Sequence, residues 1–212
     1  METRVIETTE FVGGNLALDF VDSVGGLLAT GPLPADELLR SYEDVLFFGV
    51  QRGALSERLA RELRREAREH PRKAEKAFAE ALRRREVLDS VFRPLAHGDT
   101  PPGDALDALG EFGAEALAHG RLEERDDGFE WVWDDASDLL TPLWPIGQAA
   151  LELMTNGPLD RIKGCARCRW LFLDTTKNNS RRWCSASDCG KDAKMERYIA
   201  RRRERRRRSG GS

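Results

Sequence analysis

Cysteine is missing from the first 164 of the 212 residues, and all four cysteines of the chain lie between residues 165 and 189. Long apolar runs are missing too: no stretch of 18 residues is free of charge, so the sequence predicts no membrane-spanning helix. The opening METRVIETTE carries acids and lacks the basic and apolar regions of a secretory signal, so we expect a cytoplasmic protein. In that reducing compartment, clustered thiols favour a metal ion over disulfides.

Common catalytic motifs are absent as well. G-x-S-x-G, a phosphate-binding loop and H-E-x-x-H do not occur in the chain. The three histidines, His70, His97 and His119, each lie near the end of an expected helix, where they suit the helix dipole better than catalysis. We therefore expect that the protein is not an enzyme.

Charge is present in quantity but is unevenly placed. Residues 161–212 carry 17 basic and five acidic residues, a net charge of +12, whereas residues 1–160 carry 17 basic and 32 acidic residues, a net charge of -15. An acidic body with a basic end is typical of a protein whose end meets a polyanion. The alternative is a solvated tail that is attracted to the acidic surface of its own body.

Hydrophobic periodicity predicts five helices in the acidic part, at residues 34–52, 56–70, 71–98, 105–120 and 139–157. Pro34 and Pro71 are expected at first helical positions, because the amide hydrogen that proline lacks would have no partner within the helix there. Between the last two helices the period changes, because Phe129, Trp131 and Trp133 alternate with other residues. This alternation follows a turn signal at residues 127–128 and predicts a β-hairpin.

We therefore expect a fold that is mainly α with a small β-hairpin. Residues 1–158 are predicted to form one helical domain, residues 159–208 a small metal-stapled module, and residues 209–212 a flexible tail. Trp131, Trp133 and Trp144 are expected in the core rather than in a binding site. The module also carries apolar side chains that can dock it onto the body: Leu159, Ile162, Trp170 and Phe172.

The four cysteines are spaced Cys165-x2-Cys168, then fifteen residues, then Cys184-x4-Cys189. Two close pairs at this separation predict a structural Zn²⁺ held by four thiolates, with no open position for catalysis. Buried or redox-active thiols are the alternative, although no βαβ pattern surrounds the first pair. Because a module of this size buries little apolar surface, loss of one ligand, as in Cys184→Ala, is expected to unfold it and leave the body intact.

Basic residues in and after the cysteine pairs are the predicted nucleic-acid contacts: Arg181, Arg182, Lys191, Lys194, Arg197, Arg201, Arg202 and Arg205. The last six are expected on a helix that starts near Gly190 and whose apolar edge, Met195, Tyr198 and Ile199, packs near the metal. DNA is the expected partner. The alternatives are an acidic protein surface, or an RNA that stacks on Trp170 and Trp183.

The segment FVGGNLALDFVD, residues 11–22, offers a second candidate site. Gly13 and Gly14 let the backbone approach a ligand, and Asn15 and Asp19 are able to orient one. The reading that we favour is a tight turn that leads into a core segment. A small-molecule effector and a homodimer therefore stay open.

The motifs also resemble known families. The segment 165–194 is similar to the CGNR zinc finger, with its C-x2-C pair, W-x-F-x-D strand and RRWC, and FVGGNLALDFVDS resembles the start of the ABATE domain. The resemblance implies a bacterial transcription regulator with a sensor domain and a treble-clef-like zinc finger, in which the four cysteines are the ligands and Arg181, Arg182 and Lys194 match basic positions. The chain departs from CGNR at residues 189–192, which read CGKD.

Overall fold

The computed structural model describes residues 5–126 and 128–209, and its longest body element is the helix α5 (Pro71–His97). As expected, Pro71 is its first residue, and it ends at Gly98, whose left-handed φ of 82° suits glycine. One stripe of α5 is buried, with Ala77, Ala81, Leu88, Val91 and Phe92 at helical spacing. The central helix of the body is therefore amphipathic in the way that its sequence predicts.

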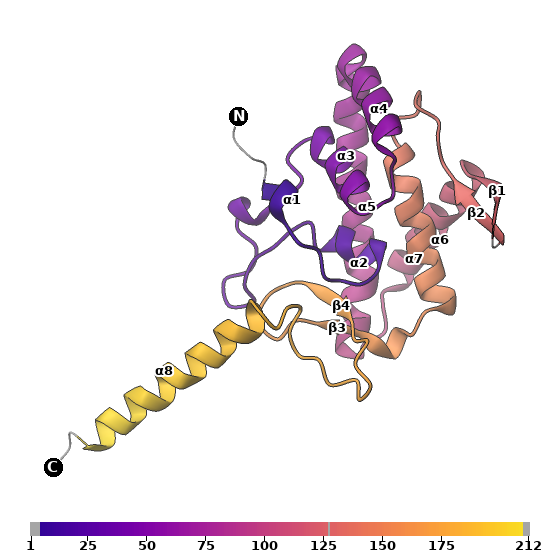
Figure 1. The fold of residues 1–212 in the computed structure, drawn as a ribbon. Helices are drawn as coiled ribbons and strands as arrows, with labels where there is room; N and C mark the ends of the chain where they lie inside the picture. Colours follow the sequence, from indigo (N-terminus) through magenta and orange to yellow (C-terminus); the bar gives the residue numbers. More distant parts are fainter. Residues whose placement is uncertain (1–4, 127, 210–212) are drawn as a thin grey trace.

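Helices surround α5 on several sides (Figure 1). In chain order they are α1 (Val5–Thr8), α2 (Leu16–Val21), α3 (Tyr42–Gln51), α4 (Glu57–Glu69), α6 (Gly103–Ala118) and α7 (Trp144–Asn156), the last preceded by the 3₁₀ turn η2 (Thr141–Leu143). Ser56 caps α4 by accepting the Leu59 amide at 3.1 Å. The helices predicted at 56–70, 71–98 and 105–120 are confirmed within two residues at each end.

The helix predicted at 34–52 starts later than expected. Only a 3₁₀ turn, η1 (Pro34–Asp36), forms at Pro34, and α3 begins at Tyr42. The intervening backbone bonds instead to the segment after α2: the Leu38 amide donates to the Ser23 carbonyl at 3.0 Å, and the Gly25 amide donates to the Asp36 carbonyl at 2.8 Å. These tertiary hydrogen bonds outweigh the local helix signal.

The predicted hairpin is present, with β1 (Arg121–Arg125) antiparallel to β2 (Gly128–Val132). Asp127 of the expected turn lies outside the described residues. The Trp133 indole donates to the Ala116 carbonyl at 2.7 Å, which ties the end of the hairpin to α6. Trp144 is buried in the main core as expected, whereas Trp131 and Trp133 are half-buried and stack on each other.

A second antiparallel hairpin, β3 (Ile162–Gly164) with β4 (Leu171–Leu173), follows the turn η3 (Leu159–Arg161). Ile162 and Leu171 are buried in the same hydrophobic cluster as α2, α5 and α7. The hairpin therefore docks on the helical body and shares its core. Figure 1 shows β3 and β4 lying against the lower end of the body.

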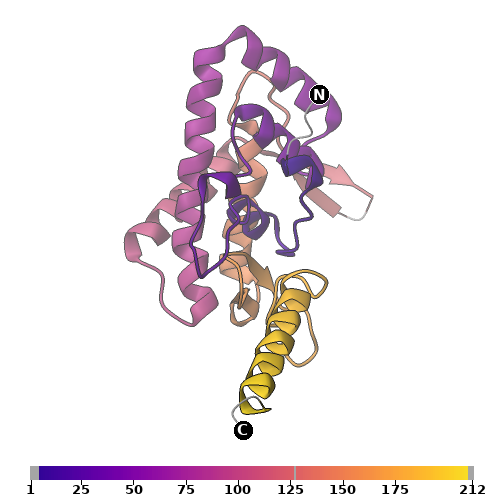
Figure 2. The ribbon, with the colours of Figure 1, turned by 90° about the vertical axis from the view of Figure 1, so that its left-hand side faces the viewer.

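The chain ends in α8 (Cys189–Ser209), which projects away from the rest of the molecule in both views (Figures 1 and 2). Ser209, expected in the flexible tail, is the last residue of this helix, and residues 210–212 of that tail lie outside the described residues. Among the helices that are described, none has the length and apolar character needed to cross a membrane.

Candidate metal centre and nucleic-acid interface

The four cysteines form two pairs that are separated by fifteen residues of the chain, and both pairs meet at the base of α8. Their Sγ atoms all lie within 4.8 Å of one another, and those of Cys168 and Cys184 are 3.5 Å apart. A tetrahedral zinc ion with Zn–S bonds of about 2.3 Å separates its ligands by ~3.8 Å. None of the four forms a disulfide. The donor set and its spacing therefore fit a structural Zn²⁺, and the expected ligand set is brought together.

The electrostatics of the cluster also favour a bound cation. Hydrogen bonds from Cys168 and Cys184 lower the pKa of the Cys165 thiol. Sharing a hydrogen bond with that thiolate raises the pKa of Cys168 to about 12, and the pKa of Cys184 is raised for the same reason. Ionising all four thiols without a cation is therefore unfavourable, and a divalent ion that binds all four as thiolates compensates their charge and displaces the protons.

Local structure positions each cysteine pair. Cys165 and Cys168 form a tight knuckle at the tip of the β3–β4 hairpin, where the Cys165 amide donates to the Trp170 carbonyl at 2.9 Å. Cys184 lies in a loop and Cys189 is the first residue of α8, so the metal fastens the helix to the knuckle. The buried Phe172 ring packs beneath the cluster. This knuckle, hairpin and helix make the treble-clef-like arrangement expected of a finger with four cysteine ligands.

The loop between the two pairs is organised by Asp174, whose side chain is fully buried. Desolvation raises the pKa of this carboxyl, but hydrogen bonds from Lys163 Nζ at 2.8 Å, from Thr176 and from the Arg181 amide at 2.7 Å outweigh it and hold the pKa below its ordinary value. Asp174 therefore shapes the loop as an ionised acceptor; in the sequence it appeared only as the last residue of the W-x-F-x-D motif.

Arg181, which is predicted to contact nucleic acid, is half-buried and packs within the finger. Its guanidinium lies 4.2 Å from the centre of the Phe172 ring and donates to backbone carbonyls of Trp183 and Cys184. A cation that lies over an aromatic face and bonds the carbonyl of a cysteine ligand stabilises this part of the finger. Arg182 is exposed, as expected of a contact residue.

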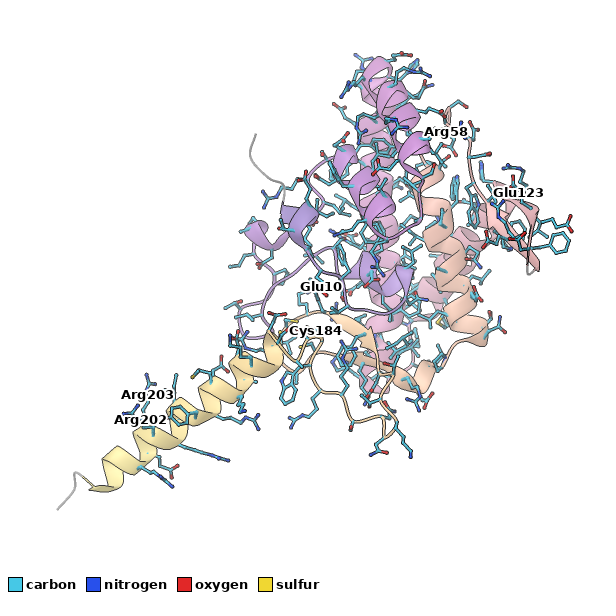
Figure 3. All side chains as sticks on the ribbon, viewed as in Figure 1. Glu10, Arg58, Glu123, Cys184, Arg202 and Arg203 are labelled. Carbon is cyan, nitrogen blue, oxygen red and sulfur yellow. The ribbon has the colours of Figure 1, made fainter. Side chains whose placement is uncertain are left out.

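The six predicted contact residues of α8 are all exposed, and they share one face: Lys191, Lys194, Arg197, Arg201, Arg202 and Arg205. At 3.6 residues per turn they fall within roughly 140° of the helix circumference and extend over about 21 Å of its length. We call these six residues the basic face. Figure 3 labels Cys184 at the base of α8 and Arg202 and Arg203 on its outer part. Arg203, which is not among the predicted contacts, lies on the opposite side of the helix by the same helical spacing.

The departure from CGNR has a structural role. Arg167, between the first two cysteines, donates to Asp192 at 2.9 Å and to Glu196 at 3.0 Å. These two acids lie on the side of α8 opposite the basic face. Asp192 therefore holds the helix against the knuckle, and Lys191 is left exposed beside it.

The apolar edge of α8 does not pack near the metal as predicted. Met195, Tyr198 and Ile199 are 54%, 58% and 41% exposed. The reason is that α8 leaves the body at once, and within the described residues Trp183, flanked by Arg182 and Arg197, is the aromatic side chain that meets its first turns. The prediction was wrong because it assumed that an apolar edge must be covered.

The contacts that dock the finger were not foreseen individually. The Leu171 amide donates to a carboxyl oxygen of the buried Asp22 at 2.8 Å, and the Leu173 amide donates to the Gly13 carbonyl at 2.8 Å. Arg93 of α5 donates to the Arg169 carbonyl at 2.9 Å. Burial raises the pKa of Asp22 well above its ordinary value. Only its place after an apolar run hinted that Asp22 would be buried.

The second candidate site, Gly13, Gly14, Asn15 and Asp19, is a closed turn. Asn15 caps α2 by accepting the Ala17 amide, and Asp19 accepts the Gly13 amide and pairs with Arg52 at 2.6 Å. A Cβ at Gly13 would lie 2.8 Å from the Asp19 carboxylate, and Gly14 has a φ of 77°. The structure brings the four residues together, and the side chains of Asn15 and Asp19 bond to protein groups in and beside the turn.

Two family models match the chain. One, "Putative stress-induced transcription regulator" (ABATE), covers residues 14–157, and the CGNR zinc finger covers residues 161–202. Both are regulator or zinc-finger types rather than enzyme families. The comparison with curated proteins found no match. The two models cover most of the chain and meet near the start of the second hairpin, so the chain belongs to the ABATE family and carries a CGNR zinc finger after the ABATE domain.

Proposed function

We propose that the protein is a zinc-containing, DNA-binding transcription regulator of the bacterial cytoplasm, in which the helical body senses a ligand or a partner, or dimerises. The observation that carries the proposal is the basic face of α8, which stands clear of the acidic body. The described end does not fold back on its own body. At physiological salt, charges interact over about 8 Å, so the outer turns of a helical face about 21 Å long escape the body's negative field.

The zinc finger supports this function by holding the helix in one direction. The metal ties Cys189 to the knuckle, and Arg167 adds two ion pairs to the next turns of α8. A preoriented row of cations suits the phosphates of a duplex, and the residues at the base of the helix are then able to reach base edges.

The test is duplex binding measured by fluorescence anisotropy between 50 and 300 mM KCl, with the zinc-loaded full chain. Six phosphate contacts predict a log–log salt slope of about -5. The triple variant Lys194→Gln, Arg201→Gln, Arg205→Gln should reduce the slope to about -3. A matched control, Arg61→Gln, Arg68→Gln, Arg72→Gln, removes three exposed charges from the body and should leave the slope unchanged. Absence of duplex binding at 50 mM KCl would refute the proposal.

A second candidate is docking of the finger on an acidic protein surface. It is favoured by the exposed Met195 and Ile199 beside the cations of α8, a combination that suits an acidic groove with an apolar floor. RNA recognition has less support, because Trp170 stacks on Phe11 and Trp183 is flanked by arginines. Competition of structured RNA against labelled duplex distinguishes the nucleic acids.

A further inference from the structure

A cavity of about 900 Å³ lies between the body and the zinc finger. Three segments enclose it: residues 8–12, residues 25–38, and the finger with Cys168, Trp170 and residues 184–189. This volume is in the range of pockets that take drug-sized ligands. The cavity is separate from the closed turn at residues 13–19 and from the basic face of α8.

The wall of the cavity is rich in apolar side chains. Val12, Leu38 and the Trp170 ring line it, and so do Leu27 and Leu33, which are 39% and 53% exposed. Large apolar groups left in contact with water around a concave surface are a signature of a binding site, because a ligand removes them from water.

Among the described residues, the charged side chains that line the cavity have one sign. Glu10, Asp36 and Asp188 line it, and no lysine or arginine does so among the described residues. None of the three forms a salt bridge with a residue that the structure describes. Three of the zinc-binding cysteines also face the cavity, and a Zn²⁺ held by four thiolates keeps a net charge of -2. Figure 3 shows Glu10 and Cys184 at this junction.

We propose that this cavity binds a small amphipathic organic cation, whose apolar body contacts Leu27, Leu33 and Trp170 and whose ammonium group faces Glu10 and Asp36. An anion of the same shape is disfavoured, because the charged side chains that line the cavity in the described residues are acids and the zinc centre is negative. Thr30 and Ser185 also line the cavity; their hydroxyl groups donate to backbone carbonyls and to Asp188, and their oxygens are able to accept from the ammonium group.

The same walls join the two parts of the protein, so the ligand is in a position to regulate the finger. The Leu28 amide donates to the Arg167 carbonyl at 3.0 Å, and the Arg169 amide donates to the Gly26 carbonyl at 3.1 Å. Arg167 in turn holds α8. A ligand that moves the 25–38 segment changes the support of α8, and this regulatory part rests on the proposed DNA binding.

The test uses three probes with the same phenylbutyl body: 4-phenylbutylamine, 4-phenylbutanol and 4-phenylbutyrate. Their affinities for the zinc-loaded full chain are measured by NMR titration of the backbone amides. We expect the order amine, alcohol, acid, with the amine at least tenfold tighter than the acid. Glu10→Gln should weaken the amine about threefold and leave the alcohol unchanged, while Glu7→Gln, an equally exposed acid outside the cavity, changes neither.

A second pair of variants tests the place of binding. Leu33→Ala should weaken all three probes about fivefold, whereas Leu122→Ala, an exposed leucine on the distant hairpin, should not. Equal affinities for amine and acid, or insensitivity to Leu33→Ala, would overturn the proposal. Amine binding with this variant pattern in a protein that binds no duplex would establish the site and refute the proposed DNA-binding function instead.

Discussion

The docking of the finger leads to a prediction that differs from the one made from sequence: loss of the metal should weaken the helical body. In Cys184→Ser the knuckle and hairpin lose their staple, and Ile162 and Leu171, 3% and 0% exposed, leave the core that they share with α2 and α5. Burial of one such side chain contributes about 1.5–3 kcal/mol, so the two together contribute about 3–6 kcal/mol.

Hydrogen bonds add to this loss. The Leu171 amide leaves Asp22 and the Leu173 amide leaves Gly13, each worth about 1 kcal/mol. For a chain of this size 1 kcal/mol corresponds to about 2–4 °C in Tm. The Tm of the helical transition should therefore fall by about 10 °C or more.

The assay is calorimetry with circular dichroism at 222 nm on the zinc-loaded wild type, on Cys184→Ser and on the chelated wild type, with Ser187→Ala, an exposed serine in the same loop, as the control. Hydrogen exchange should rise in α2 and in the second half of α5, and stay unchanged in α4, whose Leu59 and Leu63 belong to a separate cluster. A helical transition at the wild-type temperature in Cys184→Ser would show that the shared core does not stabilise the body.

Two further predictions concern single residues. Arg167→Gln releases α8 from Asp192 and Glu196 and should weaken duplex binding about two- to fivefold at 100 mM KCl, with helix content unchanged; an unaltered Kd would contradict this. Burial raises the pKa of Asp22 above 3.8, so the folded protein holds a proton that the unfolded chain releases, and the contribution of Asp22 to stability falls as pH rises from about 4. The urea midpoint of the wild type should therefore decline relative to Asp22→Asn between pH 4 and 8, and a constant difference would rule this out.

Local signals account for what was predicted correctly. Ser56 and Pro71 mark helix starts because capping and the fixed φ of proline act within one turn. Cys165-x2-Cys168 and Cys184-x4-Cys189 predict the metal centre because each pair needs only a short turn to converge on one ion. The alternation of aromatic with other residues that predicts β2 is also a local signal, because it involves only residues next to one another in the chain.

Interactions between distant segments account for the rest. The start of α3 moved to Tyr42 because backbone groups near Glu37 found partners after α2. Arg181 turned inward over the ring of Phe172, nine residues earlier in the chain, and its guanidinium also donates to the carbonyls of Trp183 and Cys184. Those two carbonyls are close in sequence, but they belong to the backbone and no side-chain pattern marks them as partners.

The sequence by itself determined the helical body, the cysteine ligands and the opposite charges of the two parts, since these follow from residue type and spacing. The tertiary structure decided that the finger shares the body's core, that α8 stands free with its basic face exposed, and that a cavity with acidic walls opens beside the metal centre. Periodicity tells which face of a segment is apolar, but only packing decides which segment, or which solvent, that face meets.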